Sequence, residues 1–181
     1  MRLNLGSHNK RFEGFTNVDI QPLEGVDIIH DLTQFPWPFE TGSIDKILAQ
    51  EFLEHLEVRF ALPVLVECRR ILKPGGDLNI QVPDIEAMCR MINRQCVCVP
   101  RKAARYEDYK SDPNCFNCSG KGLIHPERWH VAFTGAQKHP WDIHRNHFTP
   151  AYLESLLSKA GFVDLKRTPN IYKLVYLVKK T

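Results

Sequence analysis

The chain has 181 residues, which is the length of one ordinary domain. Because 43% of the residues are hydrophobic and 25% are charged, the composition predicts a globular fold with its own core and excludes a disordered chain. The formal net charge of +3 is too small to indicate a nucleic-acid partner, and no apolar run is long enough to span a bilayer. Polar residues interrupt the N-terminus at once, so we expect no signal peptide and a cytoplasmic protein.

Short apolar runs separated by turns predict strands over 2–5, 16–20, 26–29 and 44–49. A helix is predicted over 59–72, with Pro63 near its first turn. Its expected buried side consists of Leu62, Leu65, Val66 and Leu72. The sequence Lys-Pro-Gly-Gly at 73–76 ends this helix, and a fifth strand follows over 77–82.

The second half begins with a helix that Asp84 can cap and that carries the apolar residues Ile85, Met88, Cys89 and Ile92. We expect both Cys68 and Cys89 to lie in the core. A further helix begins after Thr149, with Pro150 at its first position and Gly161 past its end. Its expected buried face consists of Leu153, Leu156, Leu157 and Ala160. Strands at 162–167 and 171–178 are separated by a turn so short that they must pair antiparallel.

This order of elements predicts the fold class. Strands that alternate with helices form a mostly parallel, doubly wound α/β sheet, here of the seven-stranded type, with helices over both faces and an antiparallel C-terminal hairpin. We expect a single domain over 1–181. It contains an irregular insert at 95–148 that is rich in Cys, His, Pro, Asn and Trp.

Polar residues follow each of the first five predicted strands. Because the carboxyl ends of parallel strands share one edge, these residues indicate a ligand site there. They are Gly6 and Ser7, Asp19, Asp31, Gln50 and Glu51, and finally Pro83 and Asp84. A glycine permits close backbone approach, and a carboxylate after the second strand can accept hydrogen bonds from both hydroxyls of a ribose.

Five motifs then recur in a known order: LNLGS at 3–7, NVDI at 17–20, VDIIHDL at 26–32, FLEHL at 52–56 and RILKPGG at 70–76. The sequence resembles the class I, Rossmann-like S-adenosylmethionine-dependent methyltransferases, in particular their compact bacterial and phage members. The resemblance implies that S-adenosyl-L-methionine is the cofactor. The resemblance further implies that Leu5, Gly6 and Ser7 face its methionine part, Asp19 its ribose, Asp31 and the Leu32 backbone its adenine, and Gln50 and Glu51 its methionine end.

This chain departs from the family in its first loop, which has one glycine and leaves little room before Asp19. The first helix of the fold must therefore be short or absent. The missing glycines also disfavour a nicotinamide cofactor, whose pyrophosphate needs a glycine-rich turn at a helix N-terminus.

The acceptor side is predicted from 133–148, where the sequence FTGAQKHPWDIHRNHF resembles a family pattern over the acceptor pocket. We expect His144 to act as a base or acceptor ligand and His147 to share the catalytic region. His55, Gln137 and Trp141 are expected to line the substrate pocket. The alternative is that these side chains only hydrogen-bond a long loop.

Two cysteine pairs in the insert, Cys96 with Cys98 and Cys115 with Cys118, suggest a structural Zn²⁺ site. A metal would offset the entropy of ordering so irregular a segment. A set of Cys115, Cys118, His125 and His130 and a set of unligated thiols are the alternatives. The basic run at 101–106 between the pairs is a solvated face or a phosphate contact.

Two functions follow. The first is methyl transfer from S-adenosylmethionine to an acceptor that the sequence does not name: a small molecule, a sugar, a protein or a nucleic acid. The second is a non-catalytic zinc-containing binding module, with nucleic acid as one partner, on a methyltransferase-like scaffold.

Overall fold

The computed structural model describes residues 1–91, 133–137, 142–170 and 172–181. The chain divides into two compact units: Met1–Asp84 together with His144–Thr181, and Ile85–Ile143. The predicted zinc ligands, Cys96, Cys98, Cys115 and Cys118, and the alternative ligands His125 and His130 lie outside the described residues. The two units are therefore taken separately, and the first contains the sheet.

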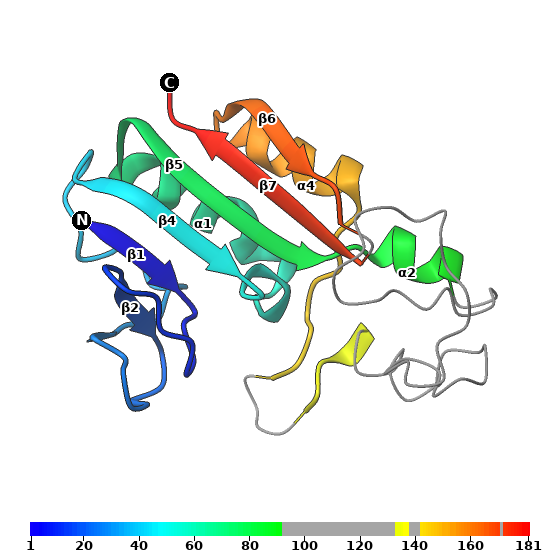
Figure 1. Ribbon diagram of the computed structural model, residues 1–181, viewed down its shortest axis with the longest axis horizontal. Coiled ribbons are helices and arrows are strands. Elements are labelled where there is room, and N and C mark those ends of the chain that lie inside the picture. The colour runs from blue at the N-terminus through cyan, green and yellow to red at the C-terminus, as the bar shows by residue number, and fades with distance from the viewer. Residues whose placement is uncertain (92–132, 138–141, 171) are drawn as a thin grey trace. The chain divides into compact units, whose positions relative to one another are not determined.

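Seven strands form one sheet in the order β3-β2-β1-β4-β5-β7-β6 (Figure 1). The first five strands run parallel to one another, and β7 runs antiparallel to both β5 and β6. This confirms the predicted fold class and the C-terminal hairpin. The strands are β1 (Arg2–Leu5), β2 (Thr16–Asp19), β3 (Ile28–Ile29), β4 (Ile44–Gln50), β5 (Leu72–Pro83), β6 (Val163–Thr168) and β7 (Lys173–Lys179).

Two α-helices and a 3₁₀ turn complete the first unit: η1 (Leu53–His55), α1 (Val58–Ile71) and α4 (Pro150–Lys159). The predicted start of α4 is confirmed, because the Thr149 side chain accepts a hydrogen bond from the amide of Tyr152 at 3.2 Å and Pro150 follows it. Its predicted face, Leu153, Leu156, Leu157 and Ala160, is buried. In the second unit, α2 covers Ile85–Met91.

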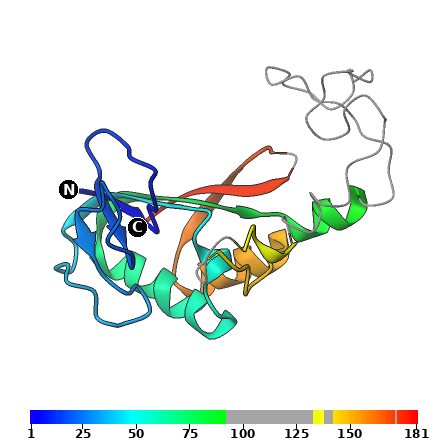
Figure 2. The same cartoon turned by 90° about the horizontal axis from the view of Figure 1, so that it is seen from below.

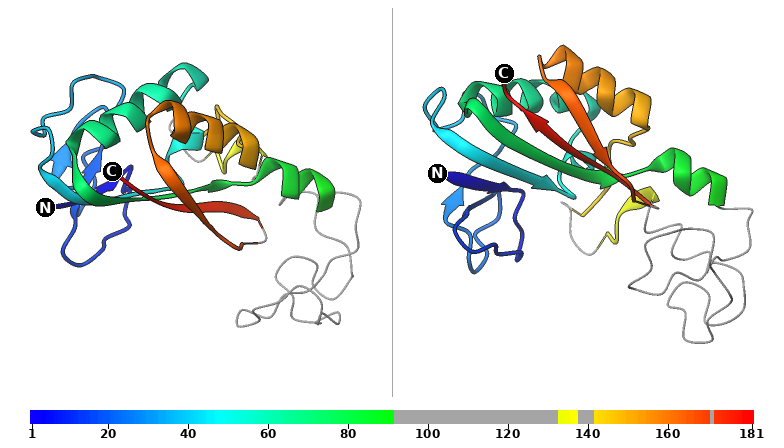
Figure 3. Two further views of the ribbon diagram at one scale, coloured as in Figure 1. Left: turned by 90° about the horizontal axis from the view of Figure 1, so that it is seen from above. Right: turned by 45° about the horizontal axis from the view of Figure 1, so that its top comes forward.

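Both helices of the first unit lie on the same face of the sheet, as Figures 2 and 3 show. The strands point alternate side chains there, such as Leu78, Ile80 and Tyr176, which are fully buried. The other face carries Asp77, Asn79 and Gln81 of β5, which are only part-buried. We had expected helices over both faces. The connections at 6–15 and 20–27 contain no helix, which confirms the short first loop and leaves a polar face.

The loop at 6–15 covers part of that polar face beside β1 and β2 (Figure 2). The side-chain amide of Asn4 donates to the Lys10 carbonyl at 2.9 Å and to Asn17 Oδ1 at 3.0 Å. Both asparagines are buried. Buried polar groups need such partners, so this pair ties the loop to the sheet.

Three expectations for helices were wrong in detail. The buried side of α1 consists of Ala61, Val64, Leu65, Glu67, Cys68 and Ile71, whereas Val66 is 47% exposed. Residues at 61, 64, 65, 68 and 71 form the i, i+3, i+4 stripe that faces the sheet, and Val66 lies off it. Pro63 stands in the second turn, because the helix begins at Val58. Cys89 on α2 is exposed, although Cys68 is buried as expected.

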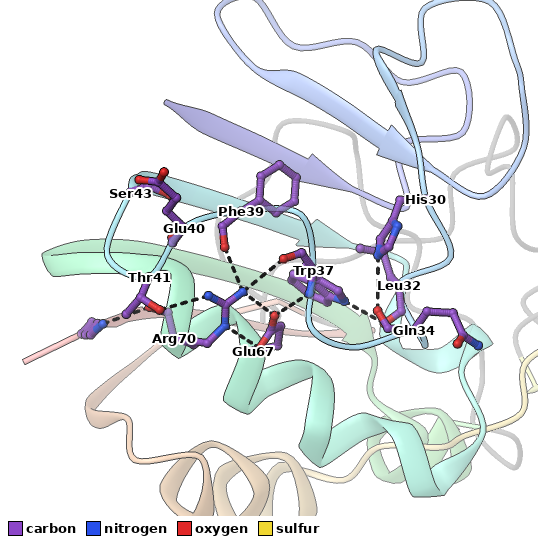
Figure 4. Close-up of polar contacts among 11 residues, drawn as sticks. His30, Leu32, Gln34, Trp37, Phe39, Glu40, Thr41, Ser43, Glu67 and Arg70 are labelled. Atoms are coloured by element: carbon purple, nitrogen blue, oxygen red, sulfur yellow. Dashed lines mark hydrogen bonds and ion pairs between the residues drawn. The ribbon is translucent and has the colours of Figure 1, made fainter.

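A buried ion pair fixes the segment between β3 and β4 against α1 (Figure 4). Glu67 accepts from the amide of Trp37 at 2.7 Å and from Arg70 at 2.6 and 2.8 Å. Arg70 also donates to the carbonyls of Trp37 and Phe39 at 3.3 and 2.9 Å. The Trp37 indole in turn donates to the Leu32 carbonyl at 3.1 Å. The pair therefore anchors the residue that directly follows Asp31.

Candidate active site

The carboxyl ends of the five parallel strands meet at one edge of the sheet. The order of the strands reverses between β1 and β4, and such a switch point is where open parallel sheets bind ligands. Because Leu5 pairs with Ala49, the next residues, Gly6 and Gln50, follow side by side. The structure thus brings two of the predicted cofactor segments together.

The loop after β1 is fastened to the end of β2. The amide of Ser7 donates to the Val18 carbonyl at 3.1 Å, and the amide of His8 donates to Asp19 Oδ2 at 2.7 Å. Gly6 has a φ of 60°, and a Cβ at this position would lie 2.5 Å from Phe52 Cδ2. Glycine is required here by the left-handed backbone and by the Phe52 ring. Space for a ligand is not needed to explain it.

The two predicted nucleoside carboxylates are already held by backbone donors. Asp19 is buried, and its second oxygen accepts from the amide of Gln21 at 2.9 Å. Asp31 Oδ1 accepts from both the amide and the hydroxyl of Thr33, at 2.9 and 2.7 Å. Burial would raise the pKa of Asp31, but the Thr33 hydrogen bonds outweigh it and lower the pKa. Both side chains are thus oriented before any ligand binds.

Gln50 and Glu51 take part in a polar network that runs across β4, β5 and β7. The Gln50 amide donates to Asn79 at 3.3 Å, and the Gln81 amide donates to Glu51 at 3.1 Å. Lys173 lies 3.4 Å from the same Glu51 oxygen. Glu51 itself has a φ of 54°, which turns the chain sharply out of β4 toward η1.

Beyond that turn, Glu54 and His55 of η1 form a cluster with His144, here called the Glu–His–His cluster. One ligand-type atom from each residue lies within 4.8 Å of the other two. The rings of His55 and His144 meet edge to face, with centroids 5.0 Å apart. The two residues that follow His144 hold the chain against η1, because the amides of Arg145 and Asn146 donate to the Glu54 carbonyl at 2.7 and 3.0 Å.

The Glu54 side chain is 1% exposed, and neither of its carboxylate oxygens has a hydrogen-bond partner. Its burial first, and then the neighbouring negative charge of Glu51, raise the pKa of Glu54 well above its ordinary value. Lys173 and Lys10 offset only part of that effect. Glu54 is therefore a buried acid group without a hydrogen-bond partner, in the turn that follows β4.

Solved structures of several methyltransferases share this fold. A S-adenosylmethionine-dependent methyltransferase from Archaeoglobus fulgidus superposes with a TM-score of 0.61 and 14% identity, over 99% of this chain and 85% of that one. A possible histamine N-methyltransferase from Thermotoga maritima gives 0.57 and 16%, over 99% and 82%. The 1,6-didemethyltoxoflavin-N1-methyltransferase of Burkholderia thailandensis, solved with 1,6-didemethyltoxoflavin and S-adenosylhomocysteine, gives 0.54 and 15%, over 99% and 70%.

The sequence itself matches the methyltransferase domain family over residues 13–80, which extend from the first loop to β5. This match covers less than half of the chain, and together with the shared fold it supports a resemblance to the class I, S-adenosylmethionine-dependent methyltransferases. No curated protein sequence matches the chain. The fold that the motifs predicted is thereby confirmed, and the predicted family is supported.

The structure brings some of the predicted acceptor residues together and not others. His55 and His144 are in contact, as described, but His147 is exposed. Gln137 lies in the second unit, where its amide donates to the Asp142 carbonyl at 3.0 Å. Trp141 lies outside the described residues. The roles expected for these side chains stay predictions.

His55 was predicted as a site residue from the sequence, but its neighbour Glu54 was not. A signal was present, since a carboxylate stands between two apolar residues and a histidine in the run FLEHL. Asn146, which is buried and whose amide nitrogen has no hydrogen-bond partner, was not predicted either.

Among the helices that the structure describes, none has the length and apolar character needed to cross a membrane.

Proposed function

We propose that this domain binds S-adenosylmethionine at the carboxyl ends of β1, β2 and β3 and transfers its methyl group to an acceptor beside the Glu–His–His cluster. The observation that carries the proposal is the fastening of the β1 loop to Asp19 through the His8 amide. It holds the abbreviated loop and a buried carboxylate together at the switch point.

The residues of the chain support a division of roles. Each oxygen of Asp19 accepts one backbone amide and keeps a second lone pair, so the carboxylate can also accept from the two hydroxyls of a ribose. Asp31 can accept from the exocyclic amine of adenine in the same way. Gln50 and Glu51, at the turn into η1, would then lie near the methionine end, as the sequence resemblance implies.

Methyl transfer from a sulfonium is an in-line displacement, in which the acceptor's lone pair forms the new bond as the carbon–sulfur bond breaks toward sulfur. The main work of the protein is alignment and exclusion of water. His144, held by main-chain bonds to η1, is suited to hold the acceptor or its proton. The acceptor itself is not identified by these residues.

The test is calorimetric titration of the purified full chain with S-adenosylhomocysteine. We expect binding by the wild-type protein and a loss of affinity of at least about tenfold for Asp19→Asn, because a hydrogen bond to a charged group contributes about 1.5–3 kcal/mol. Asp27→Asn is the matched control. Asp27 also accepts a backbone amide near β2, from Asn17 at 2.7 Å, but it stands at the start of β3.

Absence of binding at millimolar S-adenosylhomocysteine would contradict the proposal. Equal losses for the two variants would show that the effect comes from the fold and not from the ribose contact. The alternative of a non-catalytic zinc-containing module rests on cysteines outside the described residues, and no feature within the described ranges favours it.

A further inference from the structure

Within the part of the chain that the structure describes, Glu54 is the only residue with two buried side-chain polar atoms that lack a hydrogen-bond partner. A carboxylate that is 1% exposed normally has hydrogen-bond donors or a cation beside it, because burying a charge without them costs several kcal/mol. Here both oxygens lack a hydrogen-bond partner, and the nearby Glu51 adds negative charge. A positively charged group in this position would remove the imbalance.

Two imidazoles lie beside this carboxylate. One atom each from Glu54, His55 and His144 falls within 4.8 Å of the others. Three ligand atoms at about 2.0–2.2 Å from one ion, in a tetrahedral or facial set, lie about 2.8–3.6 Å apart, so side-chain rotation must bring the three groups closer by at most about 2 Å. Neutral imidazole nitrogen and carboxylate oxygen both bind divalent transition metals.

The main chain builds this arrangement independently of any ion. His55 directly follows Glu54 on η1, and its amide donates to the Phe52 carbonyl at 3.1 Å. The Glu54 carbonyl accepts the amides of Arg145 and Asn146, which fixes the backbone next to His144. The side-chain nitrogen of Asn146 is a second buried polar atom without a partner in the same segment. Ligands that the main chain already holds near one another lose less conformational entropy when they bind an ion.

We propose that the Glu–His–His cluster is a binding site for a divalent first-row transition cation, with Glu54, His55 and His144 as its ligands. A set of two histidines and one carboxylate leaves coordination positions open for another molecule. The inference deepens the proposed function, on which this part rests: the open positions accept an oxygen or nitrogen atom of the methyl acceptor. The acceptor class is therefore one with a metal-coordinating hydroxyl, carboxylate or amine.

The first experiment titrates the tag-free, chelator-treated full chain with Mn²⁺, followed by calorimetry and by the loss of the free-ion electron paramagnetic resonance signal. Mn²⁺ is chosen because oxygen and nitrogen ligands hold it, whereas thiolates prefer softer ions. A contribution from the cysteine-rich segment is thereby minimised. We expect one Mn²⁺ ion per chain.

The second experiment compares Glu54→Gln with Glu57→Gln. Glu57 stands three residues away, is exposed and pairs with Arg59, so its variant is a matched control for lost charge. We expect Glu54→Gln to weaken Mn²⁺ binding at least about 100-fold, since outer-shell partners alone contribute 10–100-fold. Glu57→Gln should bind as the wild type does. Metal-free Glu54→Gln should unfold no more readily than the metal-free wild type.

The outcomes separate the two proposals. Wild-type protein that binds S-adenosylhomocysteine but no Mn²⁺ at millimolar concentration overturns the metal site and leaves the proposed function standing. Mn²⁺ binding of equal strength in Glu54→Gln overturns the metal site as well, because the ion is then held elsewhere. Mn²⁺ binding that depends on Glu54, without any binding of S-adenosylhomocysteine, supports the site and contradicts the proposed function.

Discussion

Substitution of Glu67 by Gln tests whether the partly buried ion pair on α1 positions the segment between β3 and β4. Glu67 is 7% exposed and accepts three hydrogen bonds, one from the Trp37 amide and two from Arg70. Glutamine has the same shape but only one acceptor oxygen and no charge. Its amide group would face a donor, so at least one buried group loses its partner.

The expected loss of stability follows from these contacts. Breaking a fully buried pair by removing one partner costs about 3–5 kcal/mol. The Arg70 side chain is 28% exposed, so water compensates part of the loss. We therefore expect about 2–4 kcal/mol, which for a chain of this size lowers Tm by roughly 5–15 °C. Because Trp37 in turn holds the Leu32 carbonyl, affinity for S-adenosylhomocysteine should fall as well.

The assay is urea unfolding of the wild type, Glu67→Gln and Glu57→Gln, with the last as an exposed control worth less than about 1 kcal/mol. The hydrogen bond from Arg70 lowers the pKa of Glu67 in the folded state. Burial opposes part of this effect, and the hydrogen bond from the Trp37 amide adds to it. Its contribution is therefore complete above about pH 4.5 and is lost as pH falls through the lowered pKa. The difference between wild type and Glu67→Gln should shrink over that range. A difference below about 0.5 kcal/mol at pH 7, or one that does not change with pH, would refute this reasoning.

Three further experiments test the packing. Gly6→Ala should cost at least about 2 kcal/mol, because it adds a clash with Phe52 to the left-handed backbone, whereas Gly42→Ala, with φ 67° and open space, should cost only about 1 kcal/mol in urea unfolding. Val64→Ala should cost about 1.5–3 kcal/mol and Val66→Ala less than about 0.5 kcal/mol, and similar values would contradict the observed face of α1. In native protein treated with iodoacetamide, peptide mass spectrometry should find Cys89 alkylated and Cys68 protected. Burial first, and then Glu67, raise the pKa of the Cys68 thiol, so rapid modification would show that this core opens.

Local sequence patterns predicted most of the helices and strands of the first unit. The run from Thr149 to Gly161 contains its own cap, its proline and its stop, and α4 has those bounds. The hairpin of β6 and β7 followed from the short turn between them. The buried side of α1 did not follow from the local pattern. Residues 59–72 contain two overlapping apolar stripes, and only packing against the sheet decides which one is buried.

The sequence also indicates the polar face of the sheet. Asp77, Asn79 and Gln81 alternate with Leu78 and Ile80 along β5, which is the pattern of a strand with one solvated side. We expected helices over both faces because parallel sheets are generally covered on both sides. The short connections before β2 and β3 leave no length for the helices that would have covered this face.

The sequence by itself determined the fold class, the resemblance to the class I methyltransferases and the strand ends at which a nucleoside is expected. Each of these depends on residues close together in the chain: a strand, its turn and the polar residue that follows. Only the tertiary structure decided that Glu54 is buried without a donor and that His144, far away in the sequence, meets His55. Such contacts depend on the packing of distant segments, here through two amides on the Glu54 carbonyl, and no local pattern encodes them.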